Sequence, residues 1–366
     1  MTVTTGASVP QSARPVAPPS DRLLGTRIAP LTRRRLQAFR RNGRAFWSLW
    51  IFAAIFILSL FAELWCNDKP LVIQYDGGLY FPAFRHYPET TFGGFFEAEA
   101  DYRDPYVVDL VRDSGGWMIW PPVRFDYRTV NYNLPGAAPS PPSRDNWLGT
   151  DDQARDVVAR VVYGIRLNVL FGFSVIIFSS VIGIIVGATC GYWLGWYDLL
   201  VQRFMEIWGS VPTLYVIIII ASVITPSFWV LLTIFLLFAW MGIVDPVRAE
   251  FIRARSFDYV RAAQSLGISD FKLMFKHMFP NAMVMVLTTL PFALSGSVTL
   301  LAGLDFIGYG LPVGSPSLGE LILQARNNLH APWLGFTAFF TLGTILTLLV
   351  FVGEGVRDAF NPRKTT

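Results

Sequence analysis

The sequence contains few of the residues that most often carry chemistry. Its 366 residues include two cysteines and three histidines. The lysines are only four, namely Lys69, Lys272, Lys276 and Lys364. None of them stands in a GxxxxGK[ST] pattern, so the chain cannot bind and hydrolyse ATP through a P-loop of its own.

Catalytic and metal-binding motifs are missing as well. The sequence has no HExxH zinc motif and no GxSxG nucleophile turn. Cys66 and Cys190 lie far apart and indicate no disulfide framework. His86, His277 and His330 fall in separate segments, which argues against a shared metal site. We therefore expect no catalytic residue, no metal ligand and no cofactor in this chain, and no enzyme activity.

Charged residues are scarce too. They make up 15% of the chain, whereas 53% of the residues are hydrophobic, which is far from the composition of a soluble globular protein. Six apolar runs are long enough to cross a bilayer and contain few ionisable residues. We predict an all-α integral membrane protein with six transmembrane helices, at residues 46–66, 167–190, 204–225, 228–246, 281–303 and 334–356.

The first apolar run could instead be the core of a signal peptide. It is about 20 residues long, and it has Glu63 near its end where a signal peptide would have a small-residue cleavage site. We therefore predict that it spans the membrane. The arginines just before it, from Arg33 to Arg44, place its N-terminal side in the cytoplasm.

The charges outside the runs predict the side on which each segment lies. Residues 1–45 are expected to form a disordered, basic, cytoplasmic tail. Residues 67–166 contain ten Lys or Arg and fourteen Asp or Glu, and are expected to form a periplasmic insert between helices 1 and 2. Residues 167–357 form the core domain with helices 2 to 6, and residues 358–366 form a cytoplasmic tail.

Within the insert, residues 67–94 alternate aromatic and turn residues, which predicts short strands or irregular structure. The run from Pro135 to Pro142 predicts a stiff connector. Eight aromatic side chains either fill the core of a small outer subdomain, which we favour, or contact a ligand or docked protein. They are Tyr75, Tyr80, Phe84, Phe92, Phe95, Phe96, Trp117 and Trp120.

The polar segment 256–281, between the fourth and fifth helices, predicts two short helices. Ser256 can cap the first helix, and Asp258 lies in its first turn. Gly267 can adopt the left-handed conformation that ends this helix. Ser269 can cap the second helix, and Pro280 is expected to end it.

Small residues in this segment leave room for the backbone of another protein. The pattern Arg261-Ala262-Ala263-x-x-x-Gly267, with Pro280 thirteen residues later, resembles the EAA loop of ABC-importer permeases, although Arg261 replaces the usual Glu. In that family the loop contacts the ATPase subunit. The resemblance therefore places ATP and Mg on a partner chain. It assigns ATPase coupling to Arg261, Ala262, Ala263, Gly267, Asp258 and Pro280.

Further motifs resemble the peptide/nickel group of these permeases. Residues 146–164 resemble the LGTD…GRDV…YG segment before the second helix, and residues 304–319 resemble the outer loop after the fifth. Thr150 or Asp151 can cap a helix here, and Arg155 and Arg160 have acidic neighbours at helical spacings. The candidate residues for a periplasmic gate or scoop are Leu148, Gly149, Thr150, Asp151, Arg155 and Asp156.

Residues 40–52 and 67–84 make the resemblance to the peptide/nickel permeases more specific, because they resemble the E-class permeases of the Yej-type branch. The resemblance implies the ABC type I importer permease fold in the bacterial inner membrane, with both termini cytoplasmic. It also implies lipid contact and four further partners: a homologous second permease in a heterodimer, a fused double ATPase, a periplasmic substrate-binding protein, and peptides including microcin C. No nucleic acid partner is expected.

Two other functions remain open. An ion-coupled secondary peptide transporter acting alone would need buried carboxylates in its spans, and these runs offer almost none. A membrane-anchored binding or sensor protein would bind its ligand through residues 67–166.

Two local questions remain open as well. Gly183, Gly187 and Gly191 form a small-residue face that can pack within this chain or against another subunit. Asp245, near the end of a span, is either a gating residue or an ordinary interfacial charge.

Overall fold

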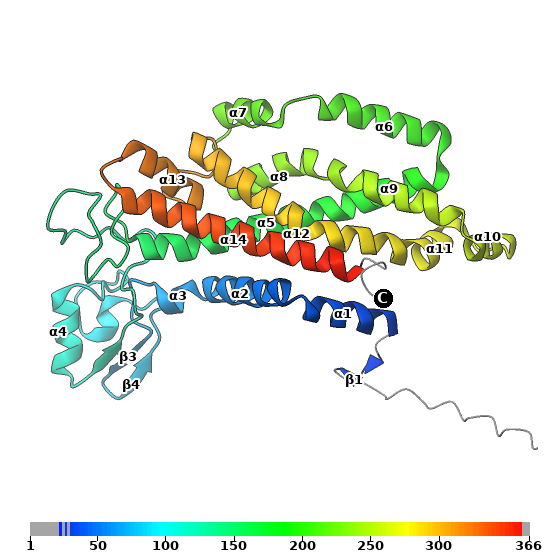
Figure 1. Ribbon diagram of the computed structural model, residues 1–366. Helices are drawn as coiled ribbons and strands as arrows, with labels where there is room; N and C mark the ends of the chain where they lie inside the picture. The colour runs from blue at the N-terminus through cyan, green and yellow to red at the C-terminus, as the bar shows by residue number, and fades with distance from the viewer. Residues whose placement is uncertain (1–21, 24–25, 28–29, 361–366) are drawn as a thin grey trace, which may run out of the picture.

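Long helices dominate the computed structural model, which describes residues 22–23, 26–27 and 30–360. They form an elongated bundle with a small α/β subdomain at one end (Figure 1). The elements in chain order are β1 Arg22–Leu23, β2 Thr26–Arg27, α1 Pro30–Arg41, α2 Gly43–Leu60, α3 Ala62–Trp65, β3 Val72–Tyr75, β4 Gly78–Tyr80, η1 Glu89–Phe92, α4 Pro105–Asp113, β5 Trp117–Ile119, α5 Val157–Trp193, α6 Gly195–Gly209, α7 Thr213–Val223, α8 Phe228–Ala239, α9 Met241–Arg255, α10 Asp258–Ser265, α11 Asp270–Leu273, η2 Met274–Met278, α12 Phe279–Ile307, α13 Leu318–Asn327 and α14 Pro332–Phe360.

Five helical segments are long and apolar enough to cross a membrane: α2, α5, α8 with α9, α11 through α12, and α14. The pair α6 and α7 makes a sixth if it is counted as one span, although it bends by 64°. Pro212 lies at this bend, and proline cannot donate the backbone hydrogen bond that would continue a helix. Counted in that way, an apolar helix lies at each of the six predicted spans, and the third is a broken helix.

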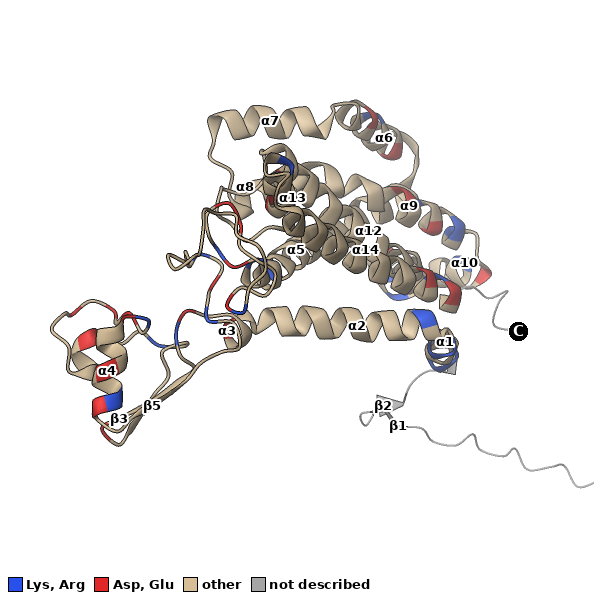
Figure 2. Ribbon diagram, turned by 60° about the vertical axis from the view of Figure 1, so that its left-hand side comes forward, with Lys and Arg blue, Asp and Glu red and all other residues tan. Residues whose placement is uncertain are grey.

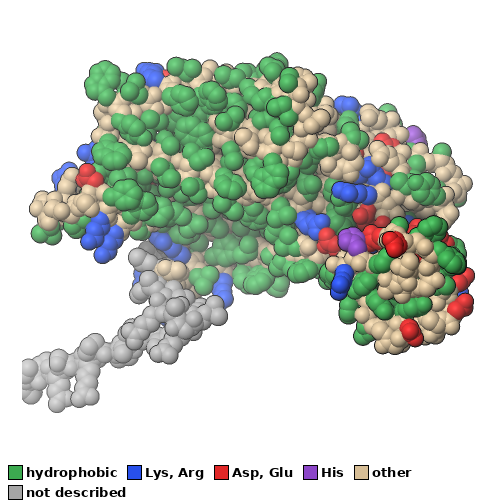
Figure 3. Space-filling view, turned by 180° about the vertical axis from the view of Figure 1, so that it is seen from behind, with side chains coloured by type: hydrophobic (Ala, Val, Ile, Leu, Met, Phe, Trp, Pro, Cys, Tyr) green, Lys and Arg blue, Asp and Glu red, His purple; other side chains and the backbone are tan. Residues whose placement is uncertain are grey.

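Apolar and charged side chains are sharply segregated along the bundle. In Figure 2, α2 carries ionisable residues only at its start. In Figure 3, hydrophobic side chains cover a broad face between two charged ends. A face of this kind is suited to lipid or to an apolar subunit contact.

Helix α5 starts at Val157, ten residues before the predicted start of the second span at 167. The reason is that Asp156 caps it, because its side chain accepts a hydrogen bond from the backbone N–H of Ala159 at 2.9 Å. The prediction that Thr150 or Asp151 caps a helix is therefore wrong, and the last ten residues of the predicted insert, 157–166, are already helical. The hydropathy of the sequence does not reveal the first turn of α5, because this turn contains Arg160. The guanidinium of Arg160 can be buried there because it pairs with Asp151 and Glu320.

The glycine face of α5 packs within the chain, against α9. A methyl group added to Gly187 would lie 2.6 Å from the carbonyl oxygen of Val244. One added to Gly191 would lie 2.6 Å from the carbonyl oxygen of Arg248. Contacts this short exclude any side chain larger than hydrogen, so close packing of α5 on α9 accounts for the small-residue pattern.

The basic N-terminal segment is helical from residue 30. Helix α1 packs on the end of α14, where Phe39 lies against Gly355 and the guanidinium of Arg35 lies 4.6 Å from the ring centre of Phe360. The expected disorder is therefore wrong for residues 30–45, which lie in α1 and at the start of α2, and residues 22–23 and 26–27 form a short strand pair. The remaining residues of the predicted tail, and the last six residues of the chain, lie outside the described residues.

The segment between α3 and α5, called the insert below, contains a three-stranded antiparallel sheet in the order β4-β3-β5, with α4 beside it. Ile73, Phe92, Tyr102 and Val107 form its buried core. Among the eight aromatic residues singled out from the sequence, four pack in this core, namely Tyr75, Tyr80, Phe92 and Trp120. The other four are exposed: Phe84, Phe95, Phe96 and Trp117.

Candidate functional site

Segment 256–281 lies at the end of the bundle that is remote from the insert (Figure 1). Helix α10 ends there in a glycine motif: the N–H of Gly267 donates to the carbonyl of Gln264 at 3.0 Å, and that of Ile268 to the carbonyl of Ala263 at 3.3 Å. Gly267 has φ of +73°, as predicted, because this left-handed conformation suits glycine best. Asp258 lies in the first turn of α10, also as predicted.

Two predicted details of this segment are wrong. Ser256 does not cap α10, because its hydroxyl donates to the carbonyl of Arg253 at 2.7 Å and so closes α9. Pro280 does not end the second helix, because α11, η2 and α12 continue into one another. Pro280 lies in the first turn of α12, just after the π-helical turn η2. Proline is tolerated in the first turn of a helix.

The exposed surface of α10 differs from the predicted one. Ala263 is 7% exposed and belongs to a core shared with α5, α9 and α12, so it faces its own chain. Arg261, Ala262 and Gly267 are exposed, together with Leu266, whose side chain is 82% exposed. Sequence reasoning missed Leu266, although a leucine in a polar loop was a usable signal.

Two phenylalanines add to the exposed apolar side chains of this segment. Phe271 and Phe275 are exposed on α11 and η2, with their ring centres 4.9 Å apart. We call Ala262, Leu266, Phe271 and Phe275 the apolar tip. Exposed apolar groups of this size mark a contact either with another protein or with the membrane.

Helices α10 and α11 are joined to the long helices. The hydroxyl of Tyr192 in α5 donates to Asp270 of α11. Ala263, Leu273 and Met278 pack into the core that contains α9 and α12. The segment that carries the apolar tip therefore shares one packed core with α9 and α12.

At the opposite end of the bundle, charged residues form a buried network. The carboxylate of Asp151 lies 2.7 Å from Arg155 and 3.3 Å from Arg160. Arg160 in turn lies 2.7 Å from Glu320 of α13. Asp151 and Arg160 are fully buried, so two arginines and two carboxylates balance one another away from water. We call these four residues the charge cluster.

The charge cluster holds the loop between α12 and α13. Arg160 donates to the carbonyl of Ser315 at 2.9 Å, and Glu320 accepts from the N–H of Gly314 at 3.2 Å. Asp305 supports the same loop by accepting from the N–H of Leu311 at 2.7 Å. The loop is thereby tied to the first turns of α5.

Asp156 and Gly149 brace the segment just before α5. Asp156 accepts from the side chain of Asn146 at 2.8 Å. Burial raises the pKa of this carboxyl, against the opposing effect of that hydrogen bond. Gly149 has φ of +77°, and a methyl group there would lie 2.7 Å from the carbonyl of Ser140. The indole of Trp333 donates to the carbonyl of Thr150 at 3.2 Å.

The six predicted gate or scoop residues differ in their exposure to solvent. Leu148 alone is exposed, and Gly149, Thr150, Asp151, Arg155 and Asp156 are buried. The buried five brace the loop and the start of α5 in this conformation. Arg155 and Arg160 both pair with Asp151, as expected, whereas among the described residues neither forms an ion pair with Asp152 or Asp156. Glu320 was missed because 160 residues separate it from Arg160 and no local pattern joins them.

A hollow in the bundle and the residue Asp245 lie between segment 256–281 and the charge cluster. A hollow of about 320 Å³ in the bundle is lined by mostly apolar side chains together with the hydroxyls of Ser179, Thr213, Thr289 and Ser297. Asp245 is exposed on α9, so the structure leaves its two alternatives open.

Comparison with known proteins adds the following. The family model described as "Binding-protein-dependent transport system inner membrane component" matches residues 180–366. The chain is 52% identical over 362 residues to the peptidoglycan transport system permease protein YejE of Agrobacterium fabrum, covering 92% of this chain and 94% of that one. It is 53% identical over 339 residues to the inner membrane ABC transporter permease protein YejE of Escherichia coli, covering 93% and 99%. It is 32% identical over 242 residues to the oligopeptide transport system permease protein OppC of Lactococcus lactis, covering 65% and 82%.

Proposed function

The chain belongs to the family of binding-protein-dependent transport system inner membrane components, and we propose that it carries peptides inward as one half of an ATP-driven importer. As a permease subunit of this family it is a multi-pass inner-membrane protein and not an enzyme. The family implies an ATPase and a substrate-binding protein as partners. The absence of a P-loop from this sequence agrees with that division of labour.

The apolar tip carries the proposal. Leu266 is exposed in the segment that resembles the EAA loop, and α10 and α11 share one core with α5, α9 and α12. We propose that the tip fits a groove on the ATPase, which holds ATP and Mg. Different affinities of that ATPase for the tip in its two nucleotide states would then shift the conformation of the spans.

The proposal also covers the subunits of the transporter and the orientation of this chain in the membrane. We propose a heterodimer with a homologous permease, served by a fused double ATPase. The basic residues around α1 and segment 256–281 support a cytoplasmic position for both, and hence a periplasmic insert. An ion-coupled transporter remains the alternative, but the few buried carboxylates among the described residues are engaged in structural contacts.

The cargo is proposed from the relatives. One is named for oligopeptides and another for peptidoglycan transport. We propose short peptides as the cargo class, with peptidoglycan-derived peptides within it. Microcin C, a peptide–nucleotide conjugate, is a narrower proposal that rests on the sequence resemblance alone.

The test is Leu266→Asp in the complete chain, with co-purification of the ATPase and peptide uptake by cells as readouts. Burial of a leucine side chain contributes about 1.5–3 kcal/mol, so we expect ATPase affinity to fall roughly 10- to 150-fold. Leu329→Asp is the matched control, because Leu329 is equally exposed in the loop between α13 and α14.

Ala262→Trp should act in the same way as Leu266→Asp, whereas Ala263→Trp would damage the core and cannot test coupling. Normal co-purification and uptake in a well-inserted Leu266→Asp variant would refute the coupling surface. Uptake driven by a proton gradient without any ATPase would favour the alternative.

A further inference from the structure

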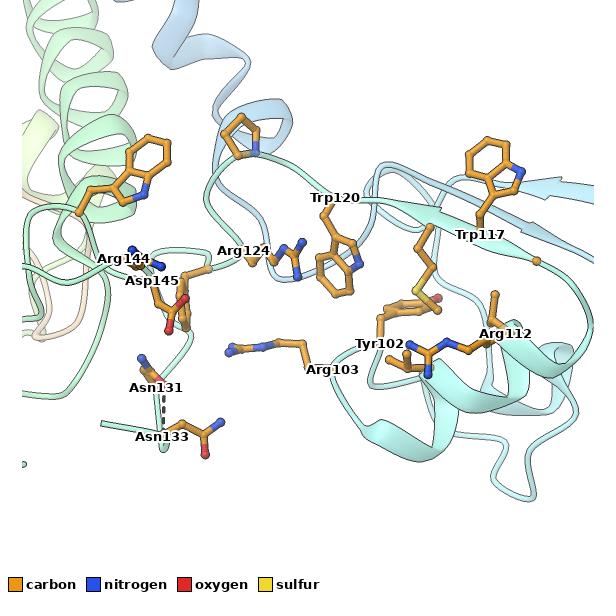
Figure 4. A pocket seen from close by; sticks show the side chains of 17 residues that line it. Tyr102, Arg103, Arg112, Trp117, Trp120, Arg124, Asn131, Asn133, Arg144 and Asp145 are labelled. Atoms are coloured by element: carbon orange, nitrogen blue, oxygen red, sulfur yellow. Dashed lines mark hydrogen bonds between the residues drawn. The ribbon is translucent and has the colours of Figure 1, made fainter. Parts of the chain in front are cut away.

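The insert contains two neighbouring hollows that share part of their walls. The first has a volume of about 860 Å³ and the second about 650 Å³. Tyr102, Arg103 and Asn133 line both. The two hollows therefore meet at Arg103, which reaches into the first one in Figure 4.

The first hollow is basic and aromatic. Its walls include four arginines, Arg103, Arg112, Arg124 and Arg144, and a single carboxylate, Asp145. Arg103 lies 4.5 Å from the ring centre of Phe125, and Arg124 lies 5.5 Å from that of Trp120. Within the described residues, only Arg112 of the four forms an ion pair, with Asp109 at 3.3 Å. Aromatic rings thus position two guanidinium groups whose hydrogen-bonding capacity is free for an anion.

The second hollow is acidic. Four carboxylates line it, Asp68, Glu99, Asp101 and Asp104, against the cations Lys69 and Arg103. Lys69 is already paired with Glu99. Burial and the nearby Asp126 raise the pKa of Asp68, so a positive charge beside this carboxyl would be stabilising. The second hollow is therefore suited to a cation.

We propose that the two hollows together bind one short peptide with free ends, its terminal carboxylate in the first and its terminal ammonium in the second. The proposal rests on the proposed function as a peptide importer and adds to it a binding site on the permease itself. Each end of a free peptide matches the charge of one hollow. Guanidinium groups bind carboxylates with two parallel hydrogen bonds, whereas neighbouring carboxylates stabilise an ammonium.

The size and the walls of the site agree with this ligand. Binding sites for small molecules usually have volumes of about 300–1,000 Å³, a range that includes each hollow. An extended tripeptide is about 10 Å long. Trp120 lines the first hollow beside Arg124 and offers apolar contact for a side chain of the ligand, without selecting one sequence.

The test uses the complete chain in lipid nanodiscs and equilibrium dialysis with labelled tri-alanine. We expect saturable binding that weakens at least about tenfold for tri-alanine amide and for N-acetyl tri-alanine, because each lacks one terminal charge. Arg124→Gln and Arg144→Gln should weaken binding of free tri-alanine by a similar factor and leave the weak binding of the amide unchanged. Arg85→Gln is the control, because Arg85 also lies over a ring, that of Tyr87, but lines neither hollow.

The outcomes separate this site from the proposed function. If tri-alanine binds equally well in all three forms, or if both arginine variants bind like wild type, the site is refuted. If no peptide binds but a photo-crosslinker at position 124 captures the substrate-binding protein, the surface docks that protein and the peptide site is refuted. Peptide uptake by cells with the complete transporter is measured in parallel. Uptake without binding refutes the site alone, whereas absence of ATP-dependent uptake refutes the proposed function.

Discussion

Removing Glu320 from the charge cluster should strongly destabilise the protein, because this carboxylate is buried beside two arginines. In Glu320→Met, Arg155 and Arg160 share only Asp151, which leaves one unbalanced positive charge in a buried site. Breaking a buried pair in this way costs about 3–5 kcal/mol. The measurement is denaturant unfolding of the purified chain in mild detergent.

The double variant Arg160→Met with Glu320→Met tests the electrostatic cause. It leaves Asp151 and Arg155, 2.7 Å apart, as a neutral pair. It still loses the hydrogen bonds to Ser315 and Gly314, each of which contributes about 1 kcal/mol. We therefore expect a cost of about 1–3 kcal/mol, which is less than that of either single change.

The control is Glu206→Met, which breaks the pair of Glu206 with Arg203 on the exposed surface of α6. A change of less than about 0.5 kcal/mol is expected there. The reasoning would be refuted by a cost below about 1 kcal/mol for Glu320→Met, or by a double variant as unstable as the sum of the two single ones.

Two further predictions concern packing and cysteine reactivity. Gly187→Ala should lower stability in the same unfolding measurement by about 1–3 kcal/mol, because the added methyl group meets the backbone of Val244; Gly343→Ala, with no atom near that position, should not. An intact yield and unchanged unfolding of Gly187→Ala would contradict the close contact of α5 with α9. Cys66 is buried, and burial raises the pKa of its thiol to about 12, so only about one thiol in 10⁴ is ionised at pH 8. Maleimide should leave it unmodified in the folded protein and label an added Leu329→Cys within minutes; rapid labelling of Cys66 would show that the contact of α3 with α5 opens.

Several features of the fold could be predicted because each depends on nearby residues. An apolar run of spanning length is unfavourable in water wherever it lies, so hydropathy located the five long apolar helices and the bent pair α6 and α7. Gly267 ends α10 as predicted, because the left-handed conformation is a local property of glycine. The contact of Arg155 with Asp151 joins residues only four apart in one segment, and Arg160 reaches the same carboxylate from the first turn of α5.

The sequence by itself thus determined a membrane helix bundle without a P-loop, and the approximate positions of its long apolar helices and of its polar loop. The tertiary structure alone decided which side chains of that loop face outward: packing against α5 and α9 turns Ala263 inward and leaves Leu266 exposed. It also decided that Arg160 can be buried in the first turn of α5, because Glu320 from a distant helix neutralises it. It brought residues 68 to 147 together around two hollows of opposite charge. These features depend on contacts between residues far apart in the chain, for which a single sequence carries no periodic signal.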